Sequence, residues 1–281
     1  MADTSATVHG FALKDPKGKF EPWTYHPRAL GDDDVEVKIQ YCGICASDIH
    51  TAFGGWGHVE YPIIVGHEIV GTASAVGKNV KDIKVGDRVG CGAQCGSCMG
   101  NEGKKCKGCP DNENQCSVHN IGTYNAKYND GERSQGGYAD MKRFHARFAF
   151  KIPDNIPSAE AAPLLCAGAT VYSPLARYGA GKGKKVGVVG IGGLGHLAVQ
   201  FAAKMGAEVI AIGRSPNKAD QAKKLGASEY ITTDDKKAME DHENSLDIII
   251  ITANGKDMPW DKSATTHHHT HTQPHTHTRH A

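Results

Sequence analysis

Residues 185–195 read KVGVVGIGGLG, and this stretch decides the class of fold. Its first five residues form a compact apolar run that predicts a buried strand, and the glycines that follow match the pattern G-x-G-x-x-G. A helix pattern over 194–205 comes next, and Gly206 stands where a glycine commonly follows a helix. A strand, a glycine-rich turn and a helix in this order are typical of a dinucleotide-binding unit.

The glycines of this turn have separate tasks in such a unit. Gly190 allows the tight turn, Gly192 lets the backbone approach a pyrophosphate, and Gly195 permits close packing of helix and strand. The helix N-terminus, at Gly193 and Leu194, offers N–H groups and positive dipole to the phosphates. The alternative is a glycine-rich turn that holds no ligand.

The end of the next predicted strand, residues 208–212, favours a particular nucleotide. NAD sites place an acid about 20 residues after the glycines, but no acid occurs from residue 209 to residue 219. Arg214 instead offers a fork of donors suited to a phosphate, with Ser215 and Lys218 nearby to assist. We therefore predict NADP(H) rather than NAD(H). The alternatives are that Arg214 is a solvated loop cation and that Ser215 only caps the next helix.

The two halves of the chain have different patterns of predicted secondary structure. Before residue 157, alternating Val35, Val37 and Ile39 predict a half-buried strand, and short β-prone pieces follow between glycines. This pattern predicts a barrel-like β domain over 1–157, interrupted by a cysteine-rich lobe at 91–116.

From residue 158 onward, strands alternate with helices. Further strands are predicted over 229–232 and 246–252. The alternation predicts a parallel doubly wound sheet over 158–262, with about four strands against six in the full order.

Length and composition exclude several classes of protein. The chain has 281 residues, 22% charged residues and a net charge of +1, which excludes a strongly basic nucleic-acid binder and a highly acidic disordered chain. The N-terminus shows no apolar leader pattern, and no run of about 18 apolar residues predicts a membrane span. Nine cysteines, an odd number, favour a cytosolic protein whose thiols are available for metal or catalysis.

Cysteines concentrate in the lobe at 91–116. Four thiolates in this polar loop suit a closed tetrahedral zinc site of the structural kind: Cys98, Cys106, Cys109 and Cys116. Cys95 forms a Cys-x2-Cys pair with Cys98 and is an alternative ligand, whereas Cys91 is expected to be a buried thiol. A set of reactive or disulfide-linked thiols is the alternative that the cytosolic compartment disfavours.

A second ligand set is dispersed along the chain. Cys45, His67 and Cys166 together form a catalytic type of zinc set, which leaves one coordination position open. Two thiolates balance the Zn²⁺ charge, so a bound alkoxide is favoured but still released. Taken alone, each of these residues would be an ordinary one, and Cys166 a core cysteine.

With these motifs, the chain resembles the zinc-containing medium-chain alcohol dehydrogenases, and within them the NADP-dependent cinnamyl-alcohol-dehydrogenase-like branch of fungal type. The pattern G-H-E-x2-G-x5-G-x2-V at 66–80 matches the zinc signature of that family. The run C-x-S-D-x-H at 45–50, the segment 163–168 and the glycine run at 190–195 follow in the family's order. The resemblance covers roughly residues 5–260.

The resemblance implies a GroES-like β-barrel catalytic domain with a zinc lobe, followed by an incomplete Rossmann sheet. It implies that Cys45, His67 and Cys166 bind catalytic zinc and that Glu68 lies behind them or alternates as a fourth ligand. The chain departs from the family pattern in the cysteine-rich lobe, where a longer gap separates Cys98 from Cys106. The assignment of the structural-zinc ligands therefore stays open.

Further roles are implied residue by residue. Ser47 would be the proton-relay hydroxyl, His50 would pass the proton to solvent, and Asp48 would orient the zinc site. Thr170 would contact the nicotinamide. Trp56 would line a pocket for aryl or bulky aldehydes, unless it only packs in the core.

The implied protein is a cytoplasmic oxidoreductase with two Zn²⁺ per chain and NADP(H), acting on a primary alcohol or aldehyde. Its full-length form is expected to be a homodimer with no nucleic-acid or membrane partner. Two alternatives remain: a truncated fragment that binds zinc and nucleotide without turnover, and a polyol or formaldehyde dehydrogenase of the same superfamily.

The last residues differ from the rest. The resemblance stops near Lys262, and residues 263–281 are a His/Thr-rich tract that cannot form an apolar core. We expect a disordered tail on a C-terminally truncated chain, arising from a translated intron, a frameshift or a wrong gene assignment. An affinity tag and a metal-binding tail are the alternatives.

Overall fold

The computed structural model describes residues 3, 5–98, 116 and 119–254. The chain divides into two compact units, residues 1–166 and 167–281. The dividing point lies after the predicted boundary at 157 because α2 (Ser158–Ala161) and the 3-10 helix η3 (Ala162–Leu165) pack on the sheet of the first unit. The predicted tail 263–281 lies outside the described residues. None of the described helices is long and apolar enough to cross a membrane.

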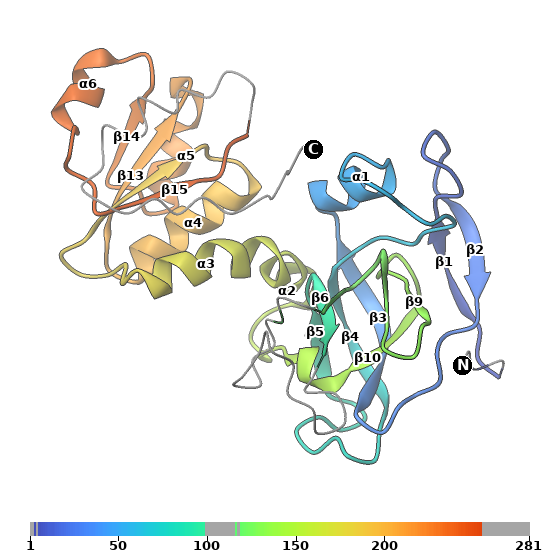
Figure 1. Ribbon diagram of the computed structural model, residues 1–281. Helices are drawn as coiled ribbons and strands as arrows, with labels where there is room; N and C mark the ends of the chain where they lie inside the picture. The colour runs from blue at the N-terminus through green and yellow to red at the C-terminus, as the bar shows by residue number, and fades with distance from the viewer. Residues whose placement is uncertain (1–2, 4, 99–115, 117–118, 255–281) are drawn as a thin grey trace. The chain divides into compact units, whose positions relative to one another are not determined.

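An antiparallel sheet of order β10-β3-β4-β5-β11 is the frame of the first unit (Figure 1). Its long central strands are β3 (Asp34–Gly43) and β4 (Glu68–Val76). They are flanked by β5 (Arg88–Cys91), β10 (Met141–His145) and β11 (Phe150–Lys151). Val35 and Val37 point into the core with Ile69 and Phe144, as the alternation of β3 predicts.

Smaller elements complete the first unit. Its two-stranded pairs are β1 (Val8–Ala12) with β2 (Glu21–Tyr25), β6 (Gln94–Ser97) with β7 (Asn120–Gly122), and β8 (Ala126–Lys127) with β9 (Arg133–Ser134). Besides α2 and η3, the first unit contains α1 (Ala46–Ala52), which follows β3, and η2 (Ala146–Phe148), which follows β10. Helix α1 matters most for the site, because it turns the chain between the two long strands.

The second unit is a parallel sheet of order β14-β13-β12-β15. The strands are β12 (Lys185–Val189), β13 (Glu208–Gly213), β14 (Glu229–Thr232) and β15 (Ile248–Ile251). Helices alternate with them: α3 (Ala167–Arg177), α4 (Gly193–Lys204), η4 (Pro216–Lys218), α5 (Ala219–Lys224) and α6 (Lys236–Asp241). The predicted strand over 246–252 is thus shorter in the structure, and α6 is an additional short helix.

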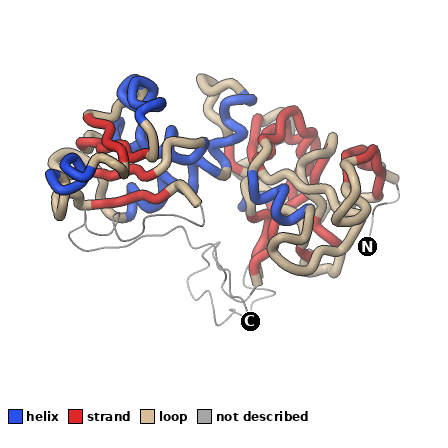
Figure 2. The backbone as a smooth tube through the Cα atoms, turned by 90° about the horizontal axis from the view of Figure 1, so that it is seen from above, coloured by secondary structure: helices blue, strands red, loops and turns tan. Residues whose placement is uncertain are grey.

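Both faces of this parallel sheet are covered, as Figure 2 shows for residues 167–254. Val188 and Ile250 pack with α3 and α4 on one face, whereas Ile210 and Ile249 pack with α6 on the other. A parallel sheet buried on both faces reads as near-continuous apolar strands, which is why 185–189 and 248–251 are so apolar in sequence.

Candidate metal and nucleotide sites

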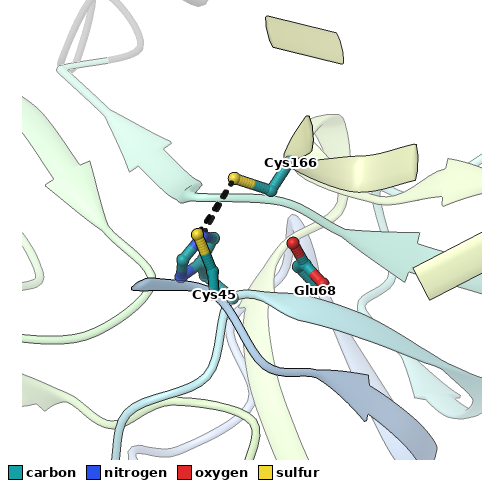
Figure 3. A group of neighbouring side chains, drawn as sticks. Cys45, Glu68 and Cys166 are labelled. Carbon is teal, nitrogen blue, oxygen red and sulfur yellow. Dashed lines mark hydrogen bonds between the residues drawn. The ribbon is translucent and has the colours of Figure 1, made fainter. Parts of the chain in front are cut away.

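Four predicted metal ligands, far apart in sequence, come together in the first unit. Cys45 immediately precedes α1, His67 and Glu68 lie at the start of β4, and Cys166 follows η3. One donor atom of each lies within 4.8 Å of the others. Figure 3 shows the side chains of Cys45, Glu68 and Cys166 gathering from three separate segments.

The distances suit zinc. The two sulfur atoms of Cys45 and Cys166 are 4.0 Å apart, and His67 Nε2 lies 3.1 Å from Cys166 Sγ. Tetrahedral zinc with ordinary bond lengths would hold its sulfurs about 3.8 Å apart and a sulfur about 3.5 Å from an imidazole nitrogen. Adjustments of about half an ångström therefore suffice to accommodate Zn²⁺. His67 and Glu68 are buried, whereas Cys45 and Cys166 are half-buried.

The carboxylate of Asp48 organises this cluster. It is fully buried, and its Oδ1 accepts hydrogen bonds from the Gly66 N–H at 3.0 Å and from His67 Nδ1 at 2.8 Å. Its Oδ2 accepts from the Cys45 N–H and from the Tyr138 hydroxyl, each at 2.9 Å. Asp48 holds the backbone of two ligand segments at once because it stands at the third position of α1, in reach of the preceding turn.

The bond from His67 to Asp48 settles which ring nitrogen faces the metal site. A carboxylate only accepts, so in the neutral imidazole Nδ1 carries the proton and Nε2 presents its lone pair toward Cys166 Sγ. This is the orientation that a metal-binding histidine needs.

The charges of the cluster are strongly perturbed. Hydrogen bonds from Cys166 and His67 lower the pKa of Cys45, and the same contact with Cys45 together with burial raises the pKa of Cys166. Burial alone would lower the pKa of His67, but Asp48 and Cys45 raise it to about 9. Burial and the Cys45 charge raise the pKa of Glu68 to about 7. Crowded negative groups of this kind favour a cation between them.

Glu68 requires a glycine opposite it. A Cβ atom at Gly43, its partner across the β3–β4 ladder, would overlap the Glu68 carboxylate. The carboxylate therefore occupies space that only glycine leaves free.

The predicted relay residues lie on α1. Ser47 Oγ is 3.5 Å from Cys45 Sγ, which places a hydroxyl beside the metal site. His50 is exposed, and its ring stacks on Trp56 with centroids 5.2 Å apart and planes at 19°. Trp56 is 51% exposed, so it is not buried in the core of the first unit. Its predicted contact with substrate stays a prediction.

The cysteine-rich lobe is described only in part. Cys106 and Cys109 lie outside the described residues, whereas Cys98 and Cys116 form a small buried cluster of their own. The alternative ligand Cys95 is fully buried in the core of the first unit, and its Sγ lies 3.3 Å from the Gly122 carbonyl oxygen. Cys91 is fully buried in β5, as predicted.

The glycine run lies between β12 and α4. Gly190 has φ +85°, the left-handed conformation that glycine adopts without strain, and it also packs against Ala253. A Cβ at Gly195 would overlap the Gly190 carbonyl, whereas Gly192 and Gly193 face open space. Gly190 and Gly195 are thus needed for the turn and its packing, whereas Gly192 and Gly193 leave the backbone of the turn accessible.

The segment after β13 holds the predicted phosphate-reading residues. Arg214 is exposed and forms no hydrogen bond or ion pair with any described residue. Lys218 Nζ donates to the Ile191 carbonyl at 2.6 Å, so it ties this segment to the glycine run. Ser215 occupies the N-cap position of η4 with Pro216 after it, as the capping alternative requires, but its hydroxyl makes no capping hydrogen bond. Thr170 is exposed on α3.

Sequence reasoning missed several residues of these sites. Tyr124 and Tyr138 place their hydroxyls on His67 and Asp48, and Thr252 donates to the carbonyl groups of Val189 and Gly190. The pair Gly136-Gly137 directly before Tyr138 was the available signal, because adjacent glycines mark a close approach of two backbones.

Comparison with known proteins identifies the class. Residues 31–154 match the family of alcohol dehydrogenase GroES-like domains, and residues 193–268 match the family of zinc-binding dehydrogenases. The chain belongs to the zinc-binding alcohol dehydrogenase family, with a GroES-like domain followed by a Rossmann-type sheet.

Individual curated relatives are similar to this chain over most of its length. The chain is 46% identical to a probable mannitol dehydrogenase of Fragaria ananassa over 88% of its length and 68% of the relative's. It is 48% identical to the NADP-dependent alcohol dehydrogenase 6 of Saccharomyces cerevisiae, over 82% of its own length and 63% of the relative's. The chain thus spans about two thirds of the length of these curated relatives.

Two solved structures are similar in fold. A cinnamyl alcohol dehydrogenase from Sorghum bicolor has a TM-score of 0.80 and 40% identity, covering 88% of this chain and 70% of that one. A cinnamyl alcohol dehydrogenase from Helicobacter pylori, solved with NADP(H), has a TM-score of 0.78 and 39% identity, covering 88% and 69%.

Proposed function

We propose that this protein is a zinc-dependent alcohol dehydrogenase that transfers hydride between NADP(H) and a primary alcohol or aldehyde. The observation that carries the proposal is the convergence of Cys45, His67, Glu68 and Cys166 around one point. Two thiols, one imidazole and a buried carboxylate are the donors of a catalytic zinc site. Names of relatives at 46–48% identity support the same chemistry.

Zinc, when bound, supplies a Lewis acid that polarises the substrate oxygen, and NADPH supplies the hydride. Asp48 holds His67 in the tautomer whose Nε2 faces the ligands. Ser47 holds a hydroxyl proton next to Cys45, and the exposed His50 on the same helix is placed to exchange protons with solvent.

The nucleotide would lie on the glycine run, with its pyrophosphate over Gly192 and the start of α4. The Arg214 guanidinium is exposed and pairs with no described residue, and Lys218 ties the same segment to the glycine run, so we expect a 2′-phosphate to be favoured over a free ribose hydroxyl. We further propose a second, structural zinc on Cys98, Cys106, Cys109 and Cys116, a cytoplasmic location and a homodimeric full-length form.

A polyol is the second candidate substrate, because several relatives are named as mannitol dehydrogenases. Two exposed apolar side chains favour the aryl or aliphatic aldehyde: Ile44, which precedes Cys45 in sequence, and Trp56, whose ring stacks on His50.

Substitution of the ligands tests the proposal. We expect Cys45→Ala and His67→Ala to reduce NADPH oxidation with cinnamaldehyde to background while NADPH binding survives, because the nucleotide contacts lie in the other unit. Cys42→Ala is the matched control, since Cys42 is a neighbouring thiol that is not one of the four grouped donors and whose Sγ donates to the Gly43 carbonyl. Undiminished turnover in either ligand variant would refute the catalytic zinc.

The parent chain distinguishes the alternatives. Oxidation of mannitol in preference to cinnamyl alcohol would identify a polyol dehydrogenase, and binding of zinc and nucleotide without turnover would identify a binding fragment.

A further inference from the structure

The pair formed by Asp48 and His67 is contacted by two tyrosine hydroxyls from outside the ligand segments. We propose that Tyr124 and Tyr138 are positioning residues of the zinc site, whose hydroxyls hold Asp48 and His67 in the geometry that metal binding needs. This inference rests on the zinc site of the proposed function.

Tyr138 reaches Asp48 because its backbone lies directly beside the segment 64–66 that leads to His67. The N–H groups of Gly136, Gly137 and Tyr138 donate to the carbonyls of Ile64, Gly66 and Val65 at 2.7, 2.8 and 3.0 Å. A Cβ at Gly136 would overlap the Val65 carbonyl, and a Cβ at Gly137 would overlap the Ile69 side chain. The two glycines thus allow the close approach, and the Tyr138 hydroxyl then donates to Asp48 Oδ2 at 2.9 Å.

Tyr124 contacts His67 itself. Its hydroxyl lies 3.1 Å from His67 Nδ1, and the two rings are tilted by 57° with centroids 5.6 Å apart. Nδ1 carries the proton that Asp48 accepts, so the Tyr124 oxygen is a second acceptor for that proton. The imidazole of His67 is thus restrained by the hydrogen bond of its Nδ1–H and by the contact of its ring with the Tyr124 ring.

Both phenols keep their own protons. Burial, followed by the charge of Asp48, raises the pKa of Tyr124 and of Tyr138 above the ordinary value for tyrosine. Each hydroxyl therefore remains neutral and adds no charge to a site that already holds a carboxylate and thiols.

A buried cation fixes the segment from which both tyrosines come. Lys142 Nζ, on β10 and 2% exposed, donates to the Thr123 carbonyl at 2.9 Å and to the Gln135 carbonyl at 2.6 Å. It also donates to the Tyr128 hydroxyl at 3.1 Å. Thr123 directly precedes Tyr124, and Gln135 directly precedes Gly136. One ammonium group thus holds both ends of the segment that presents the two hydroxyls.

Removal of the hydroxyls alone tests the inference. Tyr124→Phe and Tyr138→Phe keep the rings, and Tyr61→Phe is the matched control. Tyr61 packs in the same apolar cluster, but its hydroxyl donates to the Ala52 carbonyl rather than to the metal site. Zinc affinity is measured by competition with a chromophoric chelator, and ligand geometry by the absorption spectrum of the Co²⁺-substituted protein. The zinc that Cys45→Ala no longer binds defines the site.

We expect Tyr124→Phe and Tyr138→Phe each to weaken zinc binding at this site by about tenfold, the lower end of the effect of residues that orient metal ligands, and to shift the Co²⁺ bands. Tyr61→Phe should change neither. Equal zinc affinity and equal spectra in all three variants would overturn the inference. So would a loss of affinity matched by an equal loss of stability in the metal-free protein. If Cys45→Ala binds as much zinc as the parent chain, the zinc site itself is wrong.

Discussion

At the scale of the residue, Asp48 shows how one side chain can join two functions. As a residue of the first turn of α1 it accepts the N–H of Cys45, and as a buried acceptor it orients His67. Its pKa is lowered despite burial, because hydrogen bonds and the charge of His67 favour the carboxylate. The helix and the metal site therefore depend on the same ionised group.

Arg214 is the residue whose role can be isolated most cleanly. We expect Arg214→Asp to lower the ratio of NADPH affinity to NADH affinity by at least about tenfold, because a charge-assisted hydrogen bond worth about 1.5–3 kcal/mol is replaced by repulsion of the phosphate. Dissociation constants from fluorescence titration of both nucleotides check this.

Lys224→Asp makes the same change of charge on the exposed end of α5 and should leave the ratio unchanged. A ratio in Arg214→Asp equal to that in the control would show that Arg214 does not read the 2′-phosphate.

At the scale of the element, the turn between β12 and α4 separates packing from ligand approach. Gly195 faces the Gly190 carbonyl and lies where a Cβ would be 2.8 Å from Thr252 Oγ1, whereas nothing lies within 4 Å of a Cβ at Gly192 or Gly193. Substitutions at these positions should therefore act on different properties.

We expect Gly195→Ala to destabilise the second unit by about 1–3 kcal/mol, because the new methyl group overpacks the junction of strand and helix. Gly192→Ala should leave stability unchanged but weaken NADPH binding, since its methyl group would meet only the pyrophosphate. Hydrogen exchange of the α4 amides measures the first effect and nucleotide titration the second. Gly193→Ala is the control for stability, and equal exchange rates in Gly195→Ala and Gly193→Ala would contradict the packing argument.

At the scale of the whole molecule, each unit assembles its own site from distant segments. In the first unit, β3, β4 and η3 bring Cys45, His67, Glu68 and Cys166 together. In the second unit, the parallel order β13-β12-β15 places the glycine run, Arg214 and Thr252 at the carboxyl ends of neighbouring strands. That edge is where open parallel sheets bind ligands.

Metal binding to the first unit should depend on pH. His67 has a pKa of about 9 in the metal-free cluster and that of Cys166 is raised, so both groups hold protons at neutral pH. Zinc must displace those protons, whereas the pKa of Cys45 is lowered and it has already lost its own. The zinc association constant should therefore rise by about tenfold or more per pH unit from pH 6 to pH 8.

Competition titrations at fixed ionic strength measure this slope. The Cys45→Ala variant, which lacks one ligand of this cluster, provides the background from any other metal site. A site-specific association constant that is independent of pH would contradict the proton assignment.

Local sequence patterns predict most strands and helices and nominate the residue types of each candidate binding site. Apolar runs at 185–189 and 248–251, alternation at 35–39 and the glycine run depend on neighbours within a few residues, so they are readable without a fold. The zinc signature at 66–80 and the lack of an acid after residue 208 likewise nominate ligands and nucleotide by residue type.

Which side chains meet follows from the tertiary contacts and is not written in any local pattern. Tyr124, Tyr138 and Lys142 act on residues far along the chain, and their own neighbours in sequence carry no metal motif. Their contacts arise because the segments 64–66 and 136–138 pair across two glycines, which sets a distance that no local pattern encodes. The carboxylate of Asp48 is fully buried, so it must find its hydrogen-bond donors within the protein. The tyrosine hydroxyls are therefore important to the site.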